Sequence, residues 1–177
     1  MQRAFLNATF ALSLTLSSLA AAQEGTSLVH DGSLGLTVAA GGERRDAMTA
    51  TVRIDSGWRG LVEVGATLSP LWNHVEIRAA GRLTLFGPTV DLAALAGIRN
   101  SFGYEEWKTF FDLCAVVHVY PQVVAGPLVA VGAQYDFSPF AGVYAALTGQ
   151  MGFGQGVRFG ADVVVGFQFR TYVFDPK

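Results

Sequence analysis

The sequence contains a single cysteine, Cys114, so it can form neither an intramolecular disulfide nor a zinc site with several cysteine ligands. Charge is also scarce: only 15% of its 177 residues are charged, against about 25% in ordinary soluble domains. Its only lysines are Lys108 and Lys177. A net charge of -2 argues against a nucleic-acid-binding protein, which shows a basic surface. Hydrophobic residues make up 51% of the chain, and this excludes a disordered protein.

After residue 22 the chain also lacks a hydrophobic run of the roughly 20 residues that a membrane-spanning helix needs. Its start is of a different kind. A basic segment at 1–3 precedes a mostly apolar stretch at 4–19 and three alanines at 20–22, which is the order of a secretory signal peptide. A membrane anchor is the alternative, but this stretch is short and polar residues interrupt it. The sequence therefore predicts a signal peptide over residues 1–22 and one domain over residues 23–177.

The remaining chain alternates between apolar and polar residues with a period of two. From Val157 to Arg170, one face carries valines, phenylalanines and an alanine, whereas the other carries Arg158, Asp162 and Arg170 among small residues. Successive side chains of a strand point to opposite sides, so such a segment forms one apolar and one polar face. Segments of this kind, separated by Gly, Pro, Asn, Asp and Ser, cover residues 34–41, 48–55, 61–68, 75–85, 90–99, 111–120, 126–137, 140–148 and 157–170.

The length of the chain limits how many strands these segments can form. About 155 residues at roughly ten per strand plus turns give eight strands, or ten at most. The nine segments exceed an even number by one, so either the first segment is a partial strand or the region after Pro121 pairs differently. The connections predicted between them are longer at 42–46, 69–73 and 100–108 and tight at 57–59, 87–88 and 121–122.

Periodicity alone does not say which face points outward. A soluble lipocalin-like barrel keeps its apolar face inside, and a membrane barrel does the reverse. The near absence of lysine and the small residues of the polar face favour the membrane, with Val117 and Val163 facing lipid. The polar faces carry nearly balanced charges, as a confined lumen requires. The predicted lumen network comprises Arg53, Asp55, Glu63, Glu76, Arg78, Arg82, Asp91, Arg99, Asp112, His118, Asp136, Arg158, Asp162 and Arg170.

A signal peptide, a glycine-rich domain and about eight amphipathic strands resemble the small outer-membrane β-barrel proteins of bacteria. The resemblance implies an all-β, closed, antiparallel, up-and-down transmembrane barrel in the outer membrane. It also implies outer-membrane lipid and the barrel-assembly machinery as partners, and no cofactor. One feature departs from the family, because Phe174 is followed by three further residues, whereas such chains usually end on an aromatic residue.

No motif for catalysis or metal binding emerges. Asp112 and His118 lie about 20 Å apart along one strand, so His118 can meet an acid only from a neighbouring strand. Cys114 is predicted to be a small buried residue. Residues 105–108 are predicted to form an exposed loop. The leading hypothesis is a non-enzymatic barrel that serves envelope structure, adhesion or a minor, porin-like conductance, with no loop partner specified. A lipid-modifying enzyme of the outer membrane and a secreted lipocalin-like carrier are the alternatives.

Overall fold

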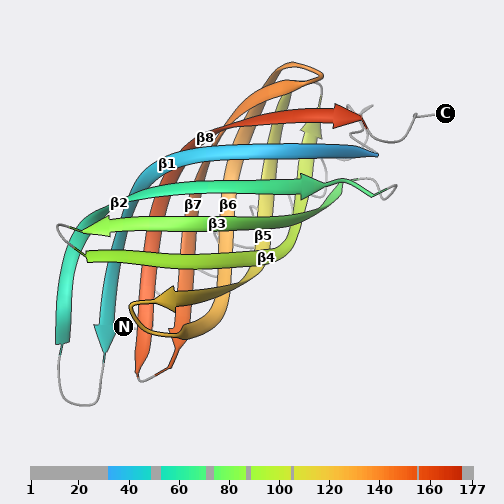
Figure 1. The fold of residues 1–177 in the computed structure, drawn as a ribbon. Coiled ribbons are helices and arrows are strands. Elements are labelled where there is room, and N and C mark those ends of the chain that lie inside the picture. Colours follow the sequence, from blue (N-terminus) through green and yellow to red (C-terminus); the bar gives the residue numbers. More distant parts are fainter. Residues whose placement is uncertain are drawn as a thin grey trace, which may run out of the picture.

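The computed structural model describes residues 32–48, 53–70, 74–86, 89–104, 106–154 and 156–172. The predicted signal peptide and Phe174 lie outside this part of the chain. The described residues form eight strands, each paired with its neighbours in sequence, and β1 also pairs with β8 (Figure 1). All eight pairings are antiparallel, so the sheet closes into an up-and-down barrel, and the predicted fold class with eight strands is confirmed. The described residues include no helix long and apolar enough to span a membrane.

The strands are 12 to 16 residues long, longer than the 9–11 residues that a tilted strand needs to span a bilayer. We call the end where β1 begins and β8 ends the terminal end, and the opposite end the distal end. The strands are β1 (Ser33–Met48), β2 (Arg53–Leu68), β3 (Val75–Phe86), β4 (Thr89–Tyr104), β5 (Trp107–Tyr120), β6 (Val124–Ser138), β7 (Ala141–Phe153) and β8 (Val157–Tyr172).

The predicted strand at 48–55 is wrong, and so are the connections predicted at 42–46 and 57–59. The connection predicted at 100–108 is wrong over most of its length, because β4 runs on to Tyr104 and β5 begins at Trp107. β1 runs on to Met48 and β2 starts at Arg53, so the chain reverses in the middle of the predicted strand. Gly42 and Gly57, which suggested turns, lie inside these strands instead. A Cβ atom at Gly42 would lie 3.2 Å from the ring of Trp58 on β2. Gly42 therefore leaves room for a side chain of the opposing strand and does not mark a turn.

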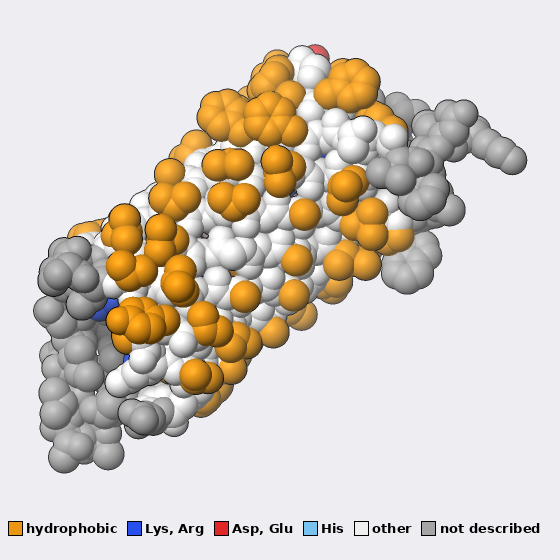
Figure 2. Space-filling view, in the orientation of Figure 1, with side chains coloured by type: hydrophobic (Ala, Val, Ile, Leu, Met, Phe, Trp, Pro, Cys, Tyr) orange, Lys and Arg blue, Asp and Glu red, His pale blue; other side chains and the backbone are white. Residues whose placement is uncertain are grey.

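The apolar side chains of the strands point outward. Val163 is 46% exposed and Val117 is 38% exposed, whereas their neighbours Asp162 and His118 are buried inside the barrel. Figure 2 shows the consequence: hydrophobic side chains cover the outer wall, and the few charged atoms in view lie at its two ends. This polarity is the reverse of a soluble barrel and matches a wall that contacts lipid.

Large aromatic side chains mark both ends of the outer wall. Each is more than half exposed, as expected where amphipathic rings lie at the level of the lipid headgroups. They include Trp107, Phe137 and Phe140 at the terminal end and Trp58, Tyr120 and Phe153 at the distal end.

Glycines on the inner wall leave room for the few large side chains of the lumen. Substituting Gly132 by alanine would place a Cβ atom in collision with the ring of Phe110 and the carbonyl oxygen of Ala145, whereas a Cβ at Gly81, on the outer wall, meets nothing within 4 Å. We expect Gly132→Ala to lower the free energy of unfolding by about 1–3 kcal/mol through overpacking. Gly81→Ala, the matched control, should leave it unchanged. Urea unfolding of both variants in lipid vesicles checks this, and equal stabilities would contradict it.

Candidate functional site in the lumen

Most of the residues predicted to line the lumen do so. The side chains of Arg53 and Asp55 lie outside the described part of the chain, and Arg158 is half-buried at the distal end. The remaining eleven are buried and face the interior: Glu63, Glu76, Arg78, Arg82, Asp91, Arg99, Asp112, His118, Asp136, Asp162 and Arg170. Within the described residues they form three clusters of ion pairs along the barrel.

The central cluster joins three arginines to three acids from five strands. Arg78 pairs with both Glu63 and Asp112. Arg82 contacts the same Glu63 at 2.6 Å and reaches across the lumen to Asp162 at 2.9 Å. All of these side chains are at least nine-tenths buried. Each charge is therefore neutralised by partners on other strands, and the cluster ties the walls of the barrel together.

Arg99 completes the central cluster. Its guanidinium donates two hydrogen bonds to Asp112, from Nε at 2.7 Å and from Nη2 at 2.9 Å. The same group lies over the ring of Phe110, 3.8 Å from the ring centre. A bidentate ion pair and an aromatic face together hold Arg99 in one orientation across the lumen.

A second cluster closes the terminal end. Asp136 accepts hydrogen bonds from Lys108 at 2.6 Å and from Arg170 at 3.0 Å. Arg170 also lies 3.8 Å from Glu76. This cluster holds two cations and two acids from four different strands.

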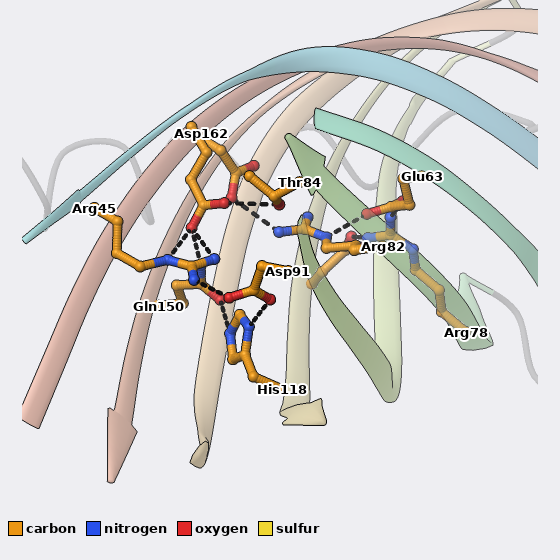
Figure 3. Close-up of polar contacts among 11 residues, drawn as sticks. Arg45, Glu63, Arg78, Arg82, Thr84, Asp91, His118, Gln150 and Asp162 are labelled. Carbon is orange, nitrogen blue, oxygen red and sulfur yellow. Dashed lines mark hydrogen bonds and ion pairs between the residues drawn. The ribbon is translucent and has the colours of Figure 1, made fainter. Parts of the chain in front are cut away.

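The third cluster lies at the distal end (Figure 3). Arg45 contacts Glu43 at 2.6 Å and also pairs with Asp91. Asp91 in turn lies 2.8 Å from Nδ1 of His118, which comes from the neighbouring strand β5. Asp91 is thus the acid on a neighbouring strand that His118 was predicted to require, since Asp112 lies too far from His118 along β5.

His118 links the third cluster to Gln150. Gln150 donates from its amide nitrogen to the carboxylate of Glu43 at 2.8 Å, which turns its amide oxygen toward Nε2 of His118 at 3.3 Å. His118 therefore has a polar partner at each ring nitrogen, Asp91 at Nδ1 and Gln150 at Nε2.

Basic and acidic side chains are evenly matched in each cluster. The central cluster has three arginines and three acids, the terminal cluster has Lys108 and Arg170 with two acids, and the distal cluster has Arg45 and His118 with two acids. The buried ionisable side chains of the described residues are Arg45, Arg78, Arg82, Arg99, Lys108, Arg170 and His118 together with Glu43, Glu63, Glu76, Asp91, Asp112, Asp136 and Asp162. Buried charges are tolerated only when they are paired in this way.

Sequence reasoning missed three members of these clusters: Glu43, Arg45 and Lys108. The first two fall in a segment that was predicted to be a connection, and Lys108 in a segment predicted to be an exposed loop. That second prediction is wrong for Lys108, because β5 begins at Trp107 and turns this lysine inward. The alternation of buried Lys108, Phe110 and Asp112 is visible in the sequence and is the signal that could have found it.

Apolar side chains fill the space between the clusters. Leu61, Leu95, Val116, Leu128 and Val164 point inward, and all are at most 3% exposed. Cys114 is buried among them, as its sequence suggested. In the described part of the chain no three histidine, cysteine or acidic side chains gather as a metal site. The lumen is thus packed with paired charges and apolar groups.

No family model matches the chain, and no curated protein matches its sequence. Solved structures do match the fold. Neisserial surface protein A has a TM-score of 0.57 at 11% identity, covering 78% of this chain and 99% of that one. The N-terminal β-barrel domain of OprF from Pseudomonas aeruginosa has a TM-score of 0.57 at 17% identity, covering 78% and 98%. Ail, the attachment invasion locus protein of Yersinia pestis, has a TM-score of 0.54 at 11% identity, covering 80% and 99%. The chain therefore has the fold of the small outer-membrane β-barrels, which confirms the resemblance predicted from its sequence.

Proposed function

We propose that this protein is a non-enzymatic, non-conducting barrel of the outer membrane that serves the structure of the cell envelope. The observation that carries the proposal is the inverted polarity of the barrel, which has apolar side chains outside and clusters of ion pairs inside. Outer-membrane lipid then surrounds the wall, and the barrel-assembly machinery inserts the chain after the signal peptide is removed. A soluble carrier of the lipocalin type needs the opposite arrangement of faces.

The short connections favour a structural role over adhesion. At the distal end the strands are joined by residues 49–52, 87–88, 121–123 and 154–156, four residues at most in each case. Outer-membrane barrels usually carry longer loops on their extracellular side, where partners bind. Connections of this length offer little surface beyond the membrane for a protein partner.

The packed lumen favours a structural role over conductance. An eight-stranded barrel is just wide enough for its side chains to fill, and here three clusters cross it at different heights. His118, the one histidine among them, has a hydrogen-bond partner at both ring nitrogens. Both partners belong to the lumen itself, and this supports a structural role for the histidine.

The test follows the full-length protein expressed in a bacterium with two membranes. We expect it in the outer-membrane fraction, with a folded band that migrates differently on a gel after boiling, and no steady conductance in planar bilayers. Recovery from the soluble fraction without detergent would contradict the membrane location. A large, stable conductance from heat-modifiable protein would replace the structural role with that of a channel.

A further inference from the structure

A small cavity opens in the lumen at the distal end. Two glycines of the inner wall, Gly152 and Gly160, leave the space, and the side chains of Arg45, His118, Gln150 and Arg158 line it. Its volume of about 10 Å³ has room for one water molecule or one oxygen atom of a larger group. Phe159 also lines it, and its ring is exposed on the outer wall, so the cavity borders the rim of the barrel.

Arg158 is a side chain of this cavity for which the described residues provide no acidic hydrogen-bond partner. The two acids of the distal cluster, Glu43 and Asp91, are hydrogen-bonded to Arg45, Gln150 and His118. Among the described residues, the only hydrogen-bond partner of the Arg158 guanidinium is the uncharged side chain of Gln122. A guanidinium has five N–H donors, so Arg158 keeps donors for a further acceptor.

The surroundings of Arg158 disfavour its charge. Burial removes part of its hydration, and Arg45 and Arg59 repel it, with Asp91 offsetting part of this repulsion. An anion in the cavity would relieve the repulsion and accept the remaining hydrogen bonds of the guanidinium. Nε and Nη1 of Arg45 are engaged by Glu43 and Asp91, whereas its buried Nη2 has no hydrogen-bond partner among the described residues, so Arg45 contributes charge beside the direct contact from Arg158.

We propose that this cavity is an anion site that takes one oxygen of a phosphate group, with Arg158 as its charged ligand. The cavity accepts one oxygen and leaves the rest of the group outside, which suits a tetrahedral oxyanion presented from the rim. Phosphate of this kind comes either from the headgroup of a lipid beside Phe159 or from free phosphate in solution. The proposal goes beyond the structural role and does not depend on it.

The test measures the thermal unfolding midpoint of the protein in uncharged maltoside micelles. Sodium phosphate is titrated against sodium chloride at matched pH and ionic strength. We expect a saturable rise in the midpoint with phosphate only, because a ligand that binds the folded state alone stabilises it. Arg158→Gln should raise the half-saturating phosphate concentration by about tenfold or more, because the variant loses one charge-assisted hydrogen bond to phosphate. Arg44→Gln, an exposed arginine of the outer wall, is the matched control and should respond as the unmodified protein does.

A second variant tests the cavity without removing a charge. The new Cβ atom of Gly160→Ala would lie 2.7 Å from the amide nitrogen of Gln150 and push that side chain into the space. We expect the same loss of phosphate response. If Arg158→Gln fails to fold, Gly160→Ala provides the test in its place. A rise that chloride reproduces, or one that persists in both variants, would overturn the proposal.

Reconstitution distinguishes the two sources of phosphate. The protein is placed in galactolipid vesicles, which contain no phosphorus, with and without phosphatidylglycerol. If the lipid raises the midpoint in the unmodified protein but not in Arg158→Gln, the ligand is a headgroup. If only added inorganic phosphate does so, the ligand is free phosphate. A midpoint that neither addition raises contradicts the site.

Discussion

Replacing Arg78 by methionine is expected to lower the free energy of unfolding by about 3–5 kcal/mol. Methionine keeps much of the volume of the side chain but removes the charge. Glu63 and Asp112, both fully buried, would each lose an ion pair that no water can replace. Urea unfolding in lipid vesicles, followed by tryptophan fluorescence, measures the loss.

Arg44→Met is the control for this substitution. Arg44 is an exposed residue of the outer wall, on the strand pair that also carries Trp58, and its replacement should change the free energy by about 0.5 kcal/mol or less. If both variants lost the same free energy, the central cluster would not hold the barrel together. A loss confined to Arg78→Met assigns the effect to the buried pairs.

Placing an arginine at Val163 is expected to destabilise the barrel by about 2–4 kcal/mol. Val163 is 46% exposed near the middle of β8, where the outer wall faces hydrocarbon. A guanidinium there must leave water or bend toward a distant headgroup, and both are unfavourable. The measurement is again the free energy of unfolding in vesicles.

An arginine at Thr171 tests whether the penalty depends on the depth of the substituted position in the membrane. Thr171 is exposed on the same strand but lies at its terminal end, where an arginine reaches the headgroups. We expect Thr171→Arg to change the free energy by about 0–1 kcal/mol. Equal penalties at the two positions would mean that the apolar wall does not span a membrane.

Much of the architecture was accessible from the sequence because strand geometry is local. A period of two sorts side chains onto two faces regardless of which strands pair, so Val163 and Asp162 were assigned to opposite faces from the sequence alone. The scarcity of lysine and the near balance of charge then favoured lipid on the apolar side. Length limited the barrel to eight or ten strands.

The first hairpin and three buried charges could not be predicted in this way, because the same residue type occurs both in turns or loops and inside strands. Glycine permits a turn, but Gly42 lies inside β1 and leaves room for the ring of Trp58 on the opposing strand. A charged residue beside glycines suggests an exposed loop, but Glu43 and Arg45 are buried in the distal cluster. Only the position of the opposing strand decides whether such a segment is a loop or part of a strand.

The sequence by itself determined the alternating faces, the reversed polarity and the class of barrel, since each depends on neighbouring residues or on composition. Closure of the sheet and its register decided which charges meet. Arg82 and Asp162, on β3 and β8, lie 80 residues apart in sequence and 2.9 Å apart in space. His118 finds Asp91 on the adjacent strand and Gln150 on β7. Such pairings depend on how far each strand slides against the next, which no local pattern specifies, so the clusters of ion pairs belong to the tertiary structure.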